Sequence, residues 1–238
     1  MARGELRIYL GAAPGVGKTY AMLGEGRRRA ARGTNVVVGA VETYGRKRTE
    51  EQLIGLEIVP PTLGGDVDID AVIVKKPHVA LIDDLARPNS ANAAHRFRWQ
   101  DVDQLLDAGI HVVSAMDIDE LESMRDVCVA ITGQQPQGTI PDRLVRGAEQ
   151  VELVDATPEA LRRRLAHGNI YPPDRVDAST LEYFRAGNLA ALRQLALLWL
   201  ADRVDESLDA YRRAHDIDAH WETRERVVVA LTGAPDGA

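Results

Sequence analysis

Short, almost entirely apolar runs recur along the first two thirds of the chain, and longer segments with helical character lie between them. Such runs, rich in Val, Ile and Leu and bounded by glycine or proline, are typical of buried β-strands. The predicted strands cover residues 6–10, 36–41, 56–59, 79–82, 110–114 and 151–154. The predicted helices among them cover residues 18–32, 48–53 and 100–108. This alternation indicates βαβ units, so we predict an α/β fold with a mostly parallel sheet flanked by helices.

The pattern changes after Asp155. Thr157 followed by Pro158 is a helix start signal, and it predicts a helix that runs to Ala166. A long helix is predicted over residues 188–215, and we expect its single apolar stripe to pack in the core, with a partner-binding face as the alternative. The stripe consists of Leu189, Leu192, Ala196, Trp199, Val204, Leu208 and Tyr211.

Residues 226–231 form another β-branched run, followed by a glycine turn. A strand with nothing after it to pair with suggests that the sequence is cut just inside a further domain. The predicted organisation is an α/β core over residues 1–155, a helical extension of the same domain over 156–222, and the start of another domain over 223–238.

The segment from Gly11 to Thr19 carries the strongest chemical signal. It reads Gly-Ala-Ala-Pro-Gly-Val-Gly-Lys-Thr between a predicted strand and a predicted helix, which is the Walker A arrangement of P-loop nucleotide-binding domains. Gly15 and Gly17 allow backbone amides to turn toward phosphate oxygens, and the helix N-terminus adds partial positive charge. Lys18 would reach the β- and γ-phosphates. The predicted ATP-binding residues are Ala13, Pro14, Gly15, Val16, Gly17, Lys18, Thr19 and Tyr20.

Two acidic residues follow the apolar run 79–82 and form a candidate Walker B motif. Because ligands of open α/β sheets bind at the carboxyl ends of the strands, Asp83 would lie near the Walker A loop. The predicted magnesium ligands are Thr19 and Asp83. Asp84 is a tentative catalytic residue that would orient a water, with a helix N-cap as the alternative role. Glu42 and Thr43 either face the γ-phosphate or serve the turn after the second strand.

Composition narrows the class of protein. The 238 residues carry a formal net charge of −7, which argues against a nucleic-acid partner because such proteins usually need a basic surface. The single cysteine, Cys128, excludes an internal disulfide and is expected to be a small buried residue. No apolar run is long enough to span a bilayer, so we expect a cytoplasmic domain that does not itself insert into a membrane. His95, Arg98 and Trp99 contact a nucleotide or partner, or they belong to an exposed helix start.

Many short stretches, in order, resemble the cytoplasmic N-terminal domain of the KdpD osmosensing potassium sensor kinases. The resemblance covers residues 4–206. The matching stretches are 11–23, 41–46, 83–86 with Asn89, 98–102, 105–110, 121–123, 131–133, 141–142, 151–155, 187–189 and 201–205.

This resemblance implies a regulatory ATP- and Mg²⁺-binding domain of a two-component sensor histidine kinase that controls potassium uptake. In the family a universal-stress-protein-like domain follows, and residues 223–238 look like its start. The implied partners are the rest of the membrane-anchored kinase and its response-regulator pathway. The sequence shows neither a phosphoacceptor box nor a kinase core, so the chain is expected to be at most a weak ATPase.

Several positions depart from the family pattern. Tyr44 replaces a histidine of the family, and the usual glutamate of Walker B is Asp84. Ala12, which lies in a stretch that matches the family, departs only from the strict Walker A motif, where a glycine stands. The family's Gly-Ser-Arg-His is Asn-Ala-Ala-His at residues 92–95, and its Asn-Val-Gln-His is Asp-Ile-Asp-Glu at 117–120. We therefore expect ATP binding with slow or absent turnover. The alternatives are a stand-alone P-loop NTPase switch and an interaction protein whose P-loop is only structural.

Overall fold

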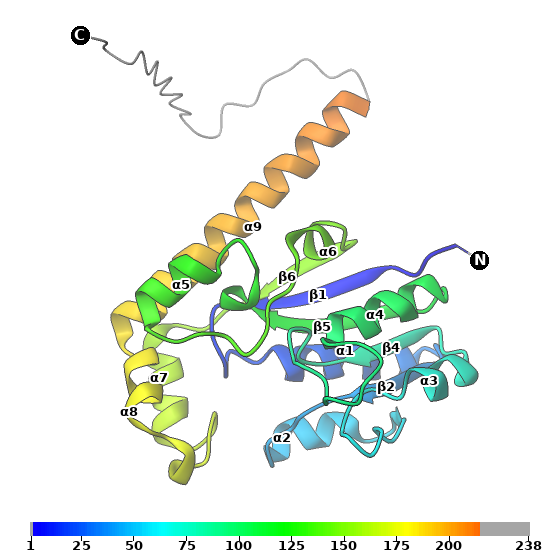
Figure 1. Cartoon of the computed structure of the whole chain (residues 1–238), viewed down its shortest axis with the longest axis horizontal. Coiled ribbons are helices and arrows are strands. Elements are labelled where there is room, and N and C mark those ends of the chain that lie inside the picture. Colours follow the sequence, from blue (N-terminus) through cyan, green and yellow to red (C-terminus); the bar gives the residue numbers. More distant parts are fainter. Residues whose placement is uncertain (1, 215–238) are drawn as a thin grey trace. The chain divides into compact units, whose positions relative to one another are not determined.

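The computed structural model describes residues 2–214, and these contain a six-stranded sheet flanked by helices (Figure 1). The strand order is β3-β2-β4-β5-β1-β6, and every pairing between neighbours is parallel. The strands are β1 Leu6–Gly11, β2 Val36–Ala40, β3 Glu57–Ile58, β4 Val79–Ile82, β5 His111–Asp117 and β6 Gln150–Val154. All six predicted strands are present, and the predicted α/β fold is confirmed.

Helices cover both faces of the sheet. The α-helices are α1 Lys18–Ala31, α2 Lys47–Glu50, α3 Ile69–Lys75, α4 Arg98–Asp107, α5 Arg125–Thr132, α6 Asp142–Arg146, α7 Pro158–Ala166, α8 Ala178–Tyr183 and α9 Ala186–Ala214. Short 3₁₀ turns lie at η1 Glu51–Leu53, η2 Ile118–Glu120 and η3 Pro173–Arg175. The sequence analysis predicts no helix at α3, α5, α6 or α8.

The sheet separates two apolar clusters, because successive side chains of a strand point to opposite faces. On one face, Met22 and Leu23 of α1 pack with Leu81 of β4 and Val113 of β5. The other face is covered by a larger cluster that includes α4 and the helices after β6. The central strand β4 is buried throughout. This is why its run of four apolar residues reads so clearly in the sequence.

The first half of α9 belongs to the larger cluster. Leu189, Leu192, Ala196 and Trp199 are buried there, so core packing is confirmed for these four residues of the predicted stripe. The prediction is wrong for Val204 and Leu208, whose exposed fractions are 51% and 43%. The side chain of Tyr211 is outside the described part.

Residues up to Asp202 form one compact unit. It contains the predicted core 1–155 and the part of the helical extension that α7, α8 and the start of α9 make up. The proposed boundaries stay predictions, and residues 223–238 lie outside the described residues. Within the part of the chain that the structure describes, no helix has the length and apolarity needed to cross a bilayer.

Candidate nucleotide site

The Walker A segment forms a tight loop between β1 and α1. Gly15 and Gly17 have φ angles of +88° and +115°, a region that residues with a Cβ rarely adopt. Gly17 is the N-cap of α1, so the free amides of the first helical turn begin directly after it. A loop with this backbone can direct several N–H groups toward one anion.

The other predicted loop residues contribute backbone or packing. The side chains of Ala13 and Val16 are buried in the larger apolar cluster. Pro14 has no N–H to donate. Of these three residues, only the amides of Ala13 and Val16 could therefore contact a phosphate.

The helices after β6 hold the loop in place. The Arg164 guanidinium of α7 donates to the carbonyl oxygens of Gly15 at 2.6 Å and Val16 at 3.1 Å. A Cβ on Gly15 would lie 2.4 Å from Cδ1 of Ile170. Arg46, which follows β2, donates to the Ile170 carbonyl oxygen at 2.8 Å. Sequence reasoning missed all three contacts with the helical extension.

The two predicted magnesium ligands lie side by side. The Thr19 hydroxyl donates to Oδ2 of Asp83 at 2.9 Å, which joins the start of α1 to the end of β4. Asp83 is only 5% exposed, and burial raises its pKa to about 6. The carboxylate next to a hydroxyl is a donor set that suits Mg²⁺, which is commonly held through few protein oxygens together with phosphates and water.

Lys18 is engaged by a carboxylate that the sequence analysis did not pair with it. Its Nζ lies 2.6 Å from Oδ1 of Asp117, the last residue of β5. Burial alone would lower the pKa of Lys18, but the charge and hydrogen bond of Asp117, together with the charges of Glu120 and Asp83, outweigh burial and the pKa is raised. Lys18 is therefore a charged group at the carboxyl end of the sheet.

Asp84 occupies an unusual backbone position with φ +56°. The predicted N-cap role is wrong, because α4 begins only at Arg98 and its N-cap is Phe97. Burial raises the pKa of Asp84, and the charges of Arg98 and Arg87 oppose that shift. Asp84 thus lies in the electrostatic field of two guanidinium groups, and its tentative catalytic role stays a prediction.

Arg98 is itself part of the site's frame. It is 2% exposed and donates to the Asp83 carbonyl oxygen at 2.8 Å, so it is not an exposed helix residue. Glu42 and Thr43 serve local structure: Oε1 of Glu42 accepts from the Tyr44 amide, and the Thr43 hydroxyl donates to Glu50. These contacts favour the turn role that the sequence left open.

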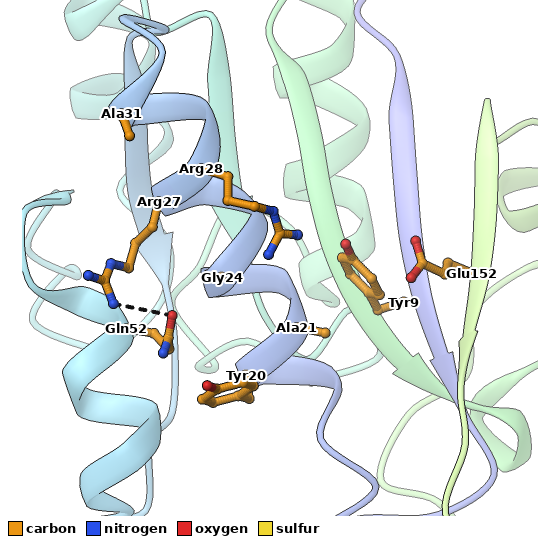
Figure 2. Close-up of a pocket in the computed structure, with 9 residues that line it drawn as sticks. All are labelled: Tyr9, Tyr20, Ala21, Gly24, Arg27, Arg28, Ala31, Gln52 and Glu152. Carbon is orange, nitrogen blue, oxygen red and sulfur yellow. Dashed lines mark hydrogen bonds between the residues drawn. The ribbon is translucent and has the colours of Figure 1, made fainter.

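Tyr20 follows Thr19 in the first turn of α1. It is 47% exposed at the start of α1 and lines an open hollow of about 530 Å³ along that helix (Figure 2). Arg28 and Gln52 line the same hollow, and Arg27 donates to Oε1 of Gln52. The cofactor role of Tyr20 stays a prediction.

Acidic groups gather where β5 ends. Burial raises the pKa of Asp119 to about 6, and the Asp117 carboxylate adds to the effect. Glu120 accepts from the Asp117 amide at 2.7 Å, and burial raises its pKa well above the usual value, with Asp117, Asp84 and Asp119 contributing. The Tyr183 hydroxyl donates to Oδ2 of Asp119 at 3.0 Å. Because the pKa values are raised in the folded chain, ionisation of Asp119 and Glu120 lowers the free energy of unfolding.

Asp119→Asn should stabilise the protein at pH 8 by about 1–3 kcal/mol and give little gain near pH 4. The pKa of Asp119 is about 6 when folded, above its ordinary value of 3.8. Folding is therefore favoured by the proton below pH 3.8, and this contribution is lost as the pH rises through 6. Asparagine removes the charge and still accepts from Tyr183. Urea unfolding at both pH values measures the difference.

Asp126→Asn is the matched control, because that carboxylate is 92% exposed on α5. Its effect should stay within about 0.5 kcal/mol at both pH values. An Asp119→Asn effect that is the same at pH 4 and pH 8 would contradict the assigned pKa shift.

Comparison with known proteins settles the family. The model of the KdpD osmosensitive K⁺ channel His kinase sensor domain matches residues 2–204. The chain belongs to the KdpD family. Its compact unit, residues 2–202 of the described part, coincides with the matched range to within two residues.

Curated KdpD proteins match almost the whole chain. The sensor protein KdpD of Mycobacterium tuberculosis is 56% identical over 98% of this chain and 28% of its own length. The Escherichia coli sensor protein KdpD is 41% identical over 96% of this chain and 26% of its own length. The putative sensor protein KdpD of Synechocystis is 39% identical over 98% of this chain and 64% of its own length. The chain thus spans about a quarter of the first two relatives.

Proposed function

We propose that this KdpD-family domain binds ATP with Mg²⁺ and serves as a regulatory nucleotide-binding module. The observation that carries the proposal is the joint placement of the glycine loop, Lys18, and the Thr19–Asp83 pair at one edge of the sheet. Anion-binding amides, a lysine and a hydroxyl–carboxylate pair are the parts that P-loop proteins use for nucleotide triphosphates and magnesium.

The residues present fit this cofactor. A Cβ at position 17 would meet no atom closer than 3.9 Å, so this side of the loop is open, while φ +115° favours glycine there. Loop amides and Lys18 would hold the phosphates, and Thr19 and Asp83 would hold the metal. Magnesium supplies charge neutralisation of the phosphate oxygens when bound. Asp117 cannot neutralise phosphate oxygens, because it is itself negatively charged.

Turnover of ATP is proposed to be slow or absent. Asp84 is one methylene shorter than the usual glutamate. Its carboxyl group interacts with the charges of Arg98 and Arg87, so it is less available to orient an attacking water. The Asp117 carboxylate places negative charge beside Lys18, where a hydrolase needs positive charge. A multiple-turnover assay should therefore detect no phosphate release above that of a Lys18→Ala variant.

The cellular role is proposed from the names of the relatives. The matching family is described as a sensor domain of an osmosensitive K⁺ channel His kinase, and the relatives are sensor proteins. We infer that the domain acts on the cytoplasmic side as part of a membrane sensor kinase in the potassium response. Its partners would then be the rest of that kinase and a response regulator.

Thermal unfolding with Mg-ATP tests the binding proposal. A ligand at 100 times its dissociation constant should add about 2.7 kcal/mol of stability, which is several degrees for a domain of this size. Lys18→Ala should lose the shift. Lys75→Ala, which removes an exposed lysine paired with Glu57, is the control and should keep it. No shift for the unmodified protein at millimolar Mg-ATP would contradict the proposal.

A further inference from the structure

The ion pair between Lys18 and Asp117 is the most unusual feature of the candidate site. Both side chains are 12% exposed, so water screens the 2.6 Å contact only weakly. Gly11 makes room for it: a Cβ there would lie 2.8 Å from both Oδ1 of Asp117 and Cδ of Lys18. The lysine side chain therefore passes over a glycine to reach the carboxylate.

Asp117 lies beside the strands that lead to the two predicted nucleotide motifs. Strand β5 lies between β1, which leads into the phosphate loop, and β4, which leads to Asp83. A Walker lysine binds β- and γ-phosphate oxygens through its ammonium group, which has three N–H donors. One donor direction of Lys18 is already directed at Asp117. A phosphate oxygen that binds Lys18 therefore competes with this carboxylate for the ammonium or shares it with the carboxylate.

The charge around Lys18 penalises a third phosphate more than a second one. The Asp117 charge contributes to raising the pKa of Asp84, Asp119 and Glu120, so these carboxyl groups lie in its electrostatic field. A γ-phosphate would bring further negative charge against the Asp117 carboxylate beside Lys18. The amides of the loop after Gly15 do not depend on Asp117, so they would still hold the phosphates of a diphosphate.

We propose that Asp117 is a specificity-determining residue that makes this site prefer a nucleoside diphosphate to a nucleoside triphosphate. The inference rests on the proposed nucleotide binding and states which form of the nucleotide is retained. It makes Asp117 a competitor of the terminal phosphate for Lys18. The domain would then report the diphosphate-bound state unless triphosphate is in large excess.

Isothermal titration calorimetry with Mg-ADP and Mg-ATP tests the preference. The unmodified protein should bind Mg-ADP on the order of tenfold more tightly than Mg-ATP, because the metal offsets part of the repulsion. Asp117→Asn keeps the shape and removes the charge, so it should tighten Mg-ATP binding more than Mg-ADP binding and bring the two affinities close together. Asp117→Ser is the second variant in case the first does not fold.

Asp107→Asn is the matched control, because it removes an exposed carboxylate paired with Arg3, which precedes β1, whereas the phosphate loop follows the end of β1. It should leave the ratio of the two dissociation constants unchanged. Equal or tighter binding of Mg-ATP by the unmodified protein would overturn the inference while the proposed function stands. So would an unchanged ratio in both Asp117 variants. Failure of every protein to bind either nucleotide would overturn the proposed function and the inference with it.

Discussion

Leu192→Ala should lower the free energy of unfolding by about 3–4 kcal/mol. Leu192 lies on α9, is 0% exposed and packs in the larger apolar cluster of the sheet. Removing its side-chain carbons loses their burial and leaves a cavity, since a close-packed interior relaxes only in part. Urea unfolding followed by circular dichroism measures the change as a shift of the midpoint at constant slope.

Leu197→Ala is the control on the same helix. Leu197 is 44% exposed, so its loss should cost less than about 1 kcal/mol, although both changes alter helix propensity in the same way. Equal effects of the two variants would show that the start of α9 does not pack as described. A large effect of Leu192→Ala alone would establish that the helical extension stabilises the unit that carries the phosphate loop.

The strands and the phosphate loop could be predicted because their signals are local. Buried strands such as β4 need consecutive apolar residues, and the φ angles of Gly15 and Gly17 need glycine at fixed positions. Cys128 was likewise predictable as a buried residue, and its exposed fraction is 0%. Each of these features depends on the identity of a few neighbouring residues.

The short helices could not be predicted from such signals. Helix α3 has Asp68 as its N-cap, whose side chain accepts from the Ala71 amide, but the helix spans only seven residues, Ile69–Lys75. A helix of two turns shows too few repeats for its periodicity to stand out. Tertiary packing, with Val72 buried against the sheet, determines that this segment is helical.

The long-range contacts of the site could not be predicted from the sequence, for a different reason. Lys18 and Asp117 are 99 residues apart, and Arg164 is 149 residues from Gly15. Strand order decides which carboxyl ends are neighbours, and no local pattern fixes that order. The sequence marked residues 117–120 only as a departure from a family pattern. Their role next to Lys18 follows from β5 lying beside β1.

Asp83→Asn should remove the dependence of ATP affinity on Mg²⁺. With Mg²⁺ present, we expect the variant to bind ATP up to about 100-fold more weakly, as is found when groups around a metal are changed. With EDTA instead, it should bind ATP as tightly as the unmodified protein or more tightly, because one negative charge near the phosphates is gone. The measurement is the ratio of the dissociation constants with EDTA and with Mg²⁺, at pH 8, where Asp83 with its pKa of about 6 is ionised.

Asp84→Asn separates this effect from a general loss of acidity at the end of β4. Asparagine tolerates the φ of +56° at this position, so the variant should fold normally. Its ratio of dissociation constants should stay close to that of the unmodified protein, since only Asp83 is bonded to Thr19. A fall in the ratio for Asp84→Asn but not for Asp83→Asn would reassign the metal ligand to Asp84. Equal falls in both variants would mean that the metal responds to the total charge rather than to one carboxylate.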